Sequence, residues 1–194
     1  MPLPSKDDVD RCRRCPLWER ATQGVAGRGS PKARLLLVGE QPGDEEDRQG
    51  EPFVGPAGRL LRRAMDEAGL REEDVYVTNA VKHFSWTPRG SRRIHKTPTQ
   101  REIAACLNWL DAEIAALRPR VIVALGTTAL GALLGRRMTL KDARGAALEH
   151  LSGAVIVATF HPSAALRAPE EAQREATYRA LVEDLGRAKQ LLER

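Results

Sequence analysis

Four short runs of consecutive apolar residues, rich in β-branched side chains, recur along the chain. They are residues 35–38, 75–78, 121–125 and 155–160. Hydrophobicity that is continuous rather than alternating is typical of strands whose two faces are both buried. The pattern therefore predicts four strands in the interior of a sheet.

Segments with apolar residues at helical spacing separate these runs. Helices are predicted at 58–68, around Ile103 to Leu117, at 127–134 and at 169–194. The second of these is expected to begin with Thr97 as N-cap, Pro98 at the first position and Gln100 at the third, in a capping box.

Strands that alternate with helices imply parallel pairing with helices on both faces of the sheet. The fold class predicted is α/β, with a central four-stranded parallel sheet flanked by helices. No internal repeat or low-complexity linker interrupts the sequence. Residues 1–194 are therefore expected to form one domain.

Composition narrows the possible environments. No segment approaches the ~20 apolar residues of a membrane span, and the first eight residues lack the apolar core of a secretion signal. A soluble, cytoplasmic monomer is expected. The 31 Lys and Arg against 26 Asp and Glu give a net charge of +5, compatible with a polyanionic partner.

Polar residues follow each predicted strand. They are Glu40 and Asp44 after the first, Asn79 after the second, Gly126-Thr127 after the third and His161-Pro162-Ser163 after the fourth. In an open α/β sheet, ligands bind beyond the carboxyl ends of the strands. These residues are expected to share one site.

A basic segment carries the histidine of greatest interest. Gly90-Ser91-Arg92-Arg93-Ile94-His95-Lys96 places one imidazole among two guanidiniums and an ammonium. This segment is predicted to be a flexible loop that can contact a phosphate backbone. Such a stretch can also be no more than a solvated face.

Three cysteines suggest a metal site. Cys12 and Cys15 form a C-x-x-C pair, which in a reducing compartment favours a metal or redox role over a structural disulfide. Cys106 lies on the apolar side of its predicted helix, and His83 can supply a fourth ligand. Zinc accepts a set of three cysteines and one histidine, and an iron–sulfur cluster can also be bound by this set.

Two long motifs resemble those of a known family. The segments 39–47 and 50–58 resemble the first motif of the iron–sulfur uracil-DNA glycosylases, and His161-Pro162-Ser163 resembles the second motif of that superfamily. The match runs from Cys12 to about Arg167. It implies DNA repair, uracil-containing DNA as the partner, free uracil as a product, and a [4Fe-4S] cluster held by the N-terminal segment with His83 and Cys106.

Three features are similar to the X-type subfamily (UdgX) rather than to the ordinary family 4 enzymes. Gln41 stands where those enzymes commonly have alanine, His83 stands where they have cysteine, and the segment 92–96 is an insertion. The resemblance implies a protein that excises uracil and then stays covalently attached to DNA through His95.

The resemblance also suggests a role for each residue. Phe53 is expected to stack on a flipped uracil, Asn79 to read its O4 and N3–H edge, and His161 to donate to O2 as the base departs. Glu40 and Asp44 are expected near the positive charge at C1′. Further substrate contacts are expected from Gln41, Ser163, Arg92, Arg93 and Lys96.

Two alternatives stay open for the function. One is an iron–sulfur uracil glycosylase that turns over, and the other is a metal-stabilised nucleic-acid-binding module without bond-breaking activity. Leu166 is expected to be a buried residue at the start of a helix, with insertion into the base stack as the alternative.

Overall fold

The sheet that organises the molecule has six strands in the order β1-β3-β2-β6-β8-β7. A computed structural model describes residues 2–194. The four inner strands are β3 (Val75–Asn79), β2 (Leu35–Gly39), β6 (Val121–Leu125) and β8 (Val155–Thr159). They pair in parallel, which confirms the four predicted strands and the α/β class.

The prediction of only four strands was wrong at the edges. β1 (Arg28–Gly29) pairs antiparallel with β3, and β7 (Leu148–Glu149) pairs antiparallel with β8. Each edge strand has two residues, so neither produces a hydrophobic run that sequence reading could detect. Edge strands this short leave few unpaired backbone groups at the two edges of the sheet.

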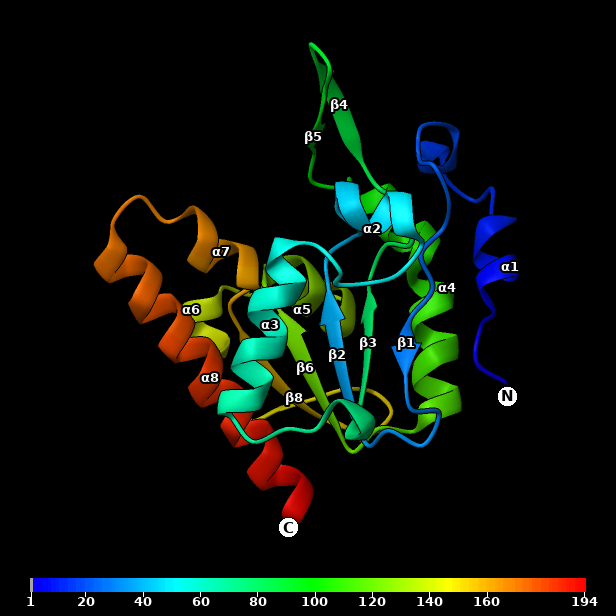
Figure 1. The fold of residues 1–194 in the computed structure, drawn as a ribbon. Coiled ribbons are helices and arrows are strands. Elements are labelled where there is room, and N and C mark those ends of the chain that lie inside the picture. Colours follow the sequence, from blue (N-terminus) through cyan, green and yellow to red (C-terminus); the bar gives the residue numbers. More distant parts are fainter. Residues whose placement is uncertain (1) are drawn as a thin grey trace.

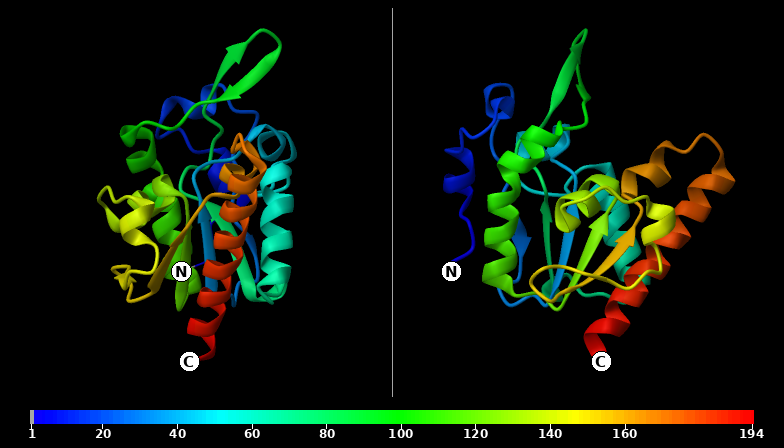
Figure 2. Two further views of the ribbon diagram at one scale, coloured as in Figure 1. Left: turned by 90° about the vertical axis from the view of Figure 1, so that its left-hand side faces the viewer. Right: turned by 180° about the vertical axis from the view of Figure 1, so that it is seen from behind.

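Helices cover both faces of the sheet (Figures 1 and 2). The elements outside the sheet, besides the hairpin described below, are α1 (Lys6–Asp10), η1 (Pro16–Glu19), α2 (Asp44–Gln49), α3 (Pro56–Glu67), η2 (Glu72–Asp74), α4 (Gln100–Leu117), α5 (Thr127–Leu134), α6 (Leu140–Ala143), α7 (Pro162–Arg167) and α8 (Glu171–Glu193). None of the helices within residues 2–194 is long and apolar enough to cross a membrane.

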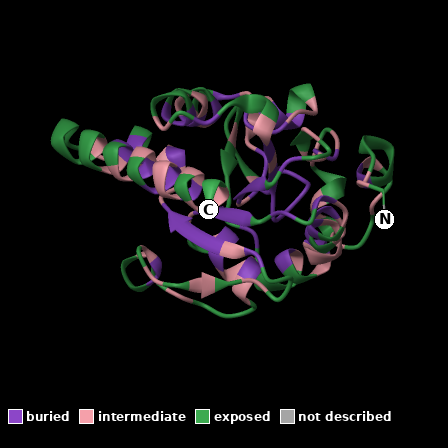
Figure 3. Cartoon of the chain, turned by 90° about the horizontal axis from the view of Figure 1, so that it is seen from below, coloured by how far each residue is buried: buried purple, intermediate pink, exposed green. Residues whose placement is uncertain are grey.

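Alternate residues of each strand enter two separate cores. Leu36 and Val38 pack with α4 and α5, whereas Leu35 and Leu37 pack with α3 and α8. All four leucine and valine side chains are 0% exposed. Because both faces are covered, every position in the strand is apolar, and Figure 3 shows the strands buried between partly exposed helices.

The basic segment is a β-hairpin rather than a loop. β4 (Trp86–Arg89) pairs antiparallel with β5 (Arg92–His95), joined by the two residues Gly90 and Ser91. Gly90 has φ +61°, as a tight hairpin turn requires. Most of the hairpin is exposed, so its strands lack apolar alternation and were missed. It projects from the carboxyl edge of the sheet (Figure 1).

The start of α4 and the exposure of Leu166 also differ from expectation. α4 begins two residues later than predicted: the side chain of Thr99, not Thr97, accepts the N–H of Glu102, and Glu102 caps Thr99 in return. Glu102 stands at the third position of the helix and completes the capping box with Thr99. Leu166 lies in α7 and is 45% exposed, so the prediction that it is buried was wrong.

The capping assignment gives a testable prediction. Thr99→Ala should lower the free energy of unfolding by about 1 kcal/mol, because it removes the acceptor at the start of α4. Thr97→Ala, at an exposed position two residues earlier, should change it by less than about 0.5 kcal/mol. Urea denaturation of the two variants measures the difference, and equal effects would contradict the assignment.

Candidate active site

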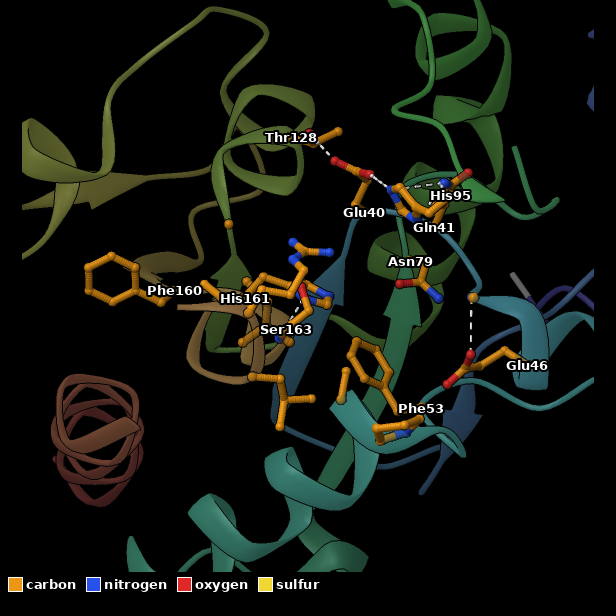
Figure 4. A pocket seen from close by; sticks show the side chains of 18 of the residues that line it. Glu40, Gln41, Glu46, Phe53, Asn79, His95, Thr128, Phe160, His161 and Ser163 are labelled. Atoms are coloured by element: carbon orange, nitrogen blue, oxygen red, sulfur yellow. Dashed lines mark hydrogen bonds and ion pairs between the residues drawn. The ribbon is translucent and has the colours of Figure 1, made fainter. Parts of the chain in front are cut away.

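The carboxyl ends of the parallel strands open into one cavity of about 510 Å³. Eight of the predicted site residues line it: Glu40, Gln41, Asp44, Phe53, Asn79, His95, His161 and Ser163. They come from the segments that follow β2 and β8, the end of β3, the segment before α3 and the end of β5. Figure 4 labels all of them except Asp44 and shows the labelled side chains around the same space. The predicted convergence at one edge of the sheet is confirmed.

Asn79 offers an unpaired acceptor to this cavity. Its residue is 3% exposed, and its Oδ1 is buried with no hydrogen-bond partner among the described residues. Leaving such an atom without a partner costs about 1–3 kcal/mol. A cavity lined by a buried amide oxygen without a protein partner is suited to a ligand that brings its own N–H donor.

Phe53 lies beside Asn79 in a strained conformation. Its φ is +57°, in the left-handed region that aromatic residues rarely adopt. A Cβ on Gly39 would lie 2.4 Å from Asn79 Oδ1 and 2.7 Å from Phe53 Cζ, so only glycine permits this close approach. Strain of this kind collects at functional sites, and here it presents an aromatic ring to the cavity.

His161 faces Phe53 across the cavity, with ring centroids 6.1 Å apart. The backbone N–H of Ser163 donates to His161 Nδ1 at 3.2 Å. Nδ1 therefore carries the lone pair, and the proton of the neutral ring lies on Nε2. Burial lowers the pKa of His161 to about 4, against the opposing charge of Glu40. At neutral pH the ring is an uncharged Nε2–H donor.

Glu40 links two further elements to the cavity. Its Oε1 lies 2.8 Å from His95 Nε2, and its Oε2 accepts the hydroxyl of Thr128 at 2.5 Å. Burial acts to raise the pKa of Glu40, but the hydrogen bonds from His95 and Thr128 outweigh it and hold the pKa below its usual value. Glu40 is therefore an ionised base in contact with an imidazole.

Gln41 holds the base of the hairpin against the cavity. Its Oε1 accepts the N–H of Ser85 at 2.7 Å, and its Nε2 donates to the carbonyls of Ser85 and Lys96. The same Nε2 lies 3.1 Å from His95 Nδ1. Ser85 and Lys96 directly precede and follow the hairpin strands, so one amide fixes both ends of the hairpin and contacts His95.

Arg93 has different partners from those expected. It forms ion pairs with Asp44 and Asp47, both at 2.5 Å, and its side chain is only 14% exposed. These contacts anchor β5 to α2 and occupy the guanidinium that was expected to contact phosphates. They also engage one oxygen of Asp44. Arg92 and Lys96 are exposed and do not line the cavity.

Two residues that sequence reasoning missed complete the site. Thr128 fixes the carboxylate of Glu40, and Glu46 accepts the N–H groups of Gly43 and Gly55. Glu46 thereby ties together the two segments of the first motif, residues 39–47 and residues 50–58. The spacing of Gly43 and Glu46 matches a helix cap and could have identified Glu46, but nothing near Thr128 in the sequence points to Glu40.

The four candidate metal ligands come from the N-terminal segment, the exit of β3 and α4. Trp109 Nε1, one turn beyond Cys106, donates to Cys12 Sγ at 3.3 Å, and the N–H of Lys82 donates to Cys106 Sγ at 3.3 Å. Burial raises the pKa of Cys106 to about 11, with further contributions from Cys15 and Cys12.

His83 fits this ligand set in its charge state. Burial lowers its pKa, opposed by Asp10, so the ring is neutral and can donate a lone pair. Within residues 2–194, no three His, Cys, Asp or Glu side chains converge closely enough to hold a metal ion. Three thiols, one neutral imidazole and two N–H donors to sulfur nevertheless match the chemistry of an iron–sulfur site.

The fold and the cavity define an α/β protein with a neutral histidine, an amide and an aromatic ring at the strand ends. A family model for the uracil DNA glycosylase superfamily matches residues 26–186. The chain belongs to this superfamily.

Relatives extend the match over nearly the whole chain. A type-4 uracil-DNA glycosylase of Thermotoga maritima is 41% identical over 187 residues, which cover 96% of this chain and 92% of the relative. A type-4 enzyme of Pyrobaculum aerophilum is 40% identical over 83% of this chain and 82% of its own length. A type-5 uracil-DNA glycosylase of Thermus thermophilus is 35% identical over 76% and 71%.

The charge state of His161 is directly testable. Nitrogen NMR of the histidine rings should show His161 as the Nε2–H tautomer, titrating near pH 4. The imidazole of a histidine in the unfolded chain titrates at about pH 6.5. Because folding keeps this ring neutral, the free energy of unfolding should fall progressively as the pH decreases from about 6.5 to about 4. Above that range the ring should have no effect on the free energy of unfolding. A midpoint near 6.5 for this ring would contradict the prediction.

Proposed function

We propose that this protein removes uracil from DNA by cleaving its N-glycosidic bond. The observation that carries the proposal is the buried, unpartnered Oδ1 of Asn79 in a cavity lined by Phe53 and His161. The superfamily and its type-4 relatives support this activity. Uracil-containing DNA is the partner and free uracil a product.

In this proposal the base leaves the stack and enters the cavity, where Phe53 covers its face. Asn79 Oδ1 accepts the N3–H of uracil and its Nδ2 donates to O4, whereas cytosine presents the inverse pattern at these positions. As the C1′–N1 bond breaks, its electron pair leaves with uracil. The neutral Nε2–H of His161 donates to O2 and stabilises the negative charge.

Two fates of C1′ follow from the contact between Glu40 and His95. In a turning-over enzyme, Glu40 orients a water that attacks C1′. The type-4 names of the relatives support this alternative more directly than covalent capture. Asp44, paired with Arg93, adds negative charge near the developing cation.

Covalent capture is a second candidate, favoured by the position of His95. His95 Nε2 lies 2.8 Å from a carboxylate oxygen inside the cavity. One ring nitrogen would form the bond to C1′ while Glu40 accepts the proton from the other, leaving a neutral N-alkylated imidazole. This is the behaviour implied by the X-type resemblance, together with Gln41, His83 and the inserted hairpin.

We also propose that residues 1–194 act as one monomeric domain whose N-terminal segment binds a [4Fe-4S] cluster through Cys12, Cys15, His83 and Cys106. The donor set and the N–H groups directed at Cys12 and Cys106 support it. When bound, the cluster supplies a structural cross-link between segments distant in sequence.

Arg92, Lys96 and Ser163 are proposed to contact the DNA. Leu166, exposed at 45%, is proposed to fill the vacated base stack.

A denaturing gel with uracil-containing single-stranded DNA separates these reactions. Covalent capture predicts a retained protein–DNA band for the parent, and His95→Ser should abolish that band yet still release uracil, because Glu40, Asn79 and His161 remain. Turnover predicts free abasic DNA from both proteins. No released uracil from either would contradict glycosylase activity, and peptide mapping of a retained band should find deoxyribose on His95.

The cluster has an independent test. Protein prepared anaerobically should be brown and contain about four irons per chain. His83→Ala should lower iron content and thermal stability together, since the cluster joins separate segments. Stoichiometric zinc without iron would contradict the assignment.

A further inference from the structure

The buried ion pair between Lys82 and Glu113 has no part in the chemistry described so far. Both side chains are 0% exposed, and Lys82 Nζ lies 2.8 Å from Glu113 Oε2. Replacing such a pair by apolar residues is often neutral or stabilising, so its presence is weak evidence for a role in stability. The partners of the two charges point to a different role.

Lys82 directs its donors at the end of β3. Its Nζ donates to Thr78 Oγ1 at 2.6 Å and to the carbonyl oxygen of Asn79 at 2.8 Å. Together with Glu113, these acceptors use all three hydrogens of the ammonium. One hydrogen bond of this fully buried lysine therefore holds the main chain of Asn79, the residue whose amide faces the cavity.

Glu113 completes the network from α4. Its Oε1 accepts the hydroxyl of Thr78 at 3.0 Å and the backbone N–H of Gly27 at 3.2 Å. Every polar group of the pair has a partner. A closed network of this kind admits few alternative arrangements, so it fixes the groups that it contacts.

The backbone around Asn79 is held from the other side as well. The N–H groups of Ala80 and Val81 donate to the carbonyls of Gly39 and Glu40, both at 2.9 Å. In contrast, Asn79 Oδ1 has no partner within the described part of the chain. The amide is therefore oriented through its backbone and by its close approach to Gly39, and among the described residues no hydrogen bond holds its oxygen (Figure 4).

We propose that the Lys82–Glu113 ion pair is a positioning device that orients the Asn79 amide and so determines the affinity of the cavity for uracil. The inference rests on the proposed function, because it takes uracil as the ligand of Asn79. The N–H of Lys82 also donates to Cys106 Sγ, so the same residue connects the base-reading amide to the proposed cluster ligands.

The experiment measures free uracil binding to the intact protein by calorimetry, with uracil excision from DNA as a second readout. Lys82→Met/Glu113→Leu removes both charges and leaves no unpaired ion in the core. It should fold, yet bind uracil at least about tenfold more weakly, because a displaced amide no longer meets the N3–H and O4 groups. Unchanged uracil affinity in a folded double variant would overturn the proposal.

A double-mutant cycle separates positioning from general destabilisation. In an Asn79→Ala background, the same pair of replacements should cause little further loss of uracil binding, because the amide it positions is gone. A purely structural role predicts the same loss in both backgrounds, and that result would overturn the proposal. If the parent protein itself fails to bind or release uracil, the proposed function fails instead.

Two further variants guard the interpretation. Tyr178→Phe removes a buried hydroxyl that donates to Glu67 at 2.8 Å between α8 and α3. It should lower stability without changing uracil affinity. If the double replacement does not fold, Glu113→Gln retains the size of the side chain and should weaken uracil binding severalfold, and an unchanged affinity in this variant would overturn the proposal.

Discussion

Burial of the parallel sheet on both faces is the constraint on which the rest of the structure depends. Leu36 and Val38 pack into one core while Leu35 and Leu37 pack into the other, so the strands have no room for polar chemistry. Apart from Tyr76 and Thr78 in β3, the polar side chains of the four inner strands lie where the strands end. Because the strands are parallel, their carboxyl ends lie at one edge, and the whole candidate site forms there.

The cavity at this edge contains features that raise the free energy of the folded protein. Phe53 is held at positive φ, and Asn79 Oδ1 is buried without a partner. His161 is kept neutral by burial and by the N–H of Ser163. In the proposed complex, the N–H of a planar base gives Asn79 Oδ1 a partner and a base carbonyl accepts from His161. Local strain and unpaired buried polar atoms of this kind distinguish a binding site from an ordinary surface hollow.

The hairpin shows how an exposed segment becomes part of the cavity. β4 and β5 have little core of their own, and a two-stranded hairpin is marginally stable in isolation. Gln41 binds both ends of the hairpin and Arg93 pairs with Asp44 and Asp47. These contacts come from the first motif, so the residues that shape the cavity also place His95 beside Glu40. The position of His95 in the cavity depends on this anchoring.

The sequence alone determined the four inner strands, the four helices α3, α4, α5 and α8, and eight residues of the cavity. Continuous apolar runs reveal strands buried on both faces, and the residues that follow them must meet at one edge. Tertiary structure decided what local patterns do not encode. The edge strands are held by their neighbours, and the hairpin is mostly exposed, with polar residues on both of its faces. Arg93 forms ion pairs with Asp44 and Asp47, and Thr128 donates a hydrogen bond to Glu40, because packing brings segments that are distant in sequence together. The Lys82–Glu113 pair lies 31 residues apart and forms only when α4 covers the end of β3.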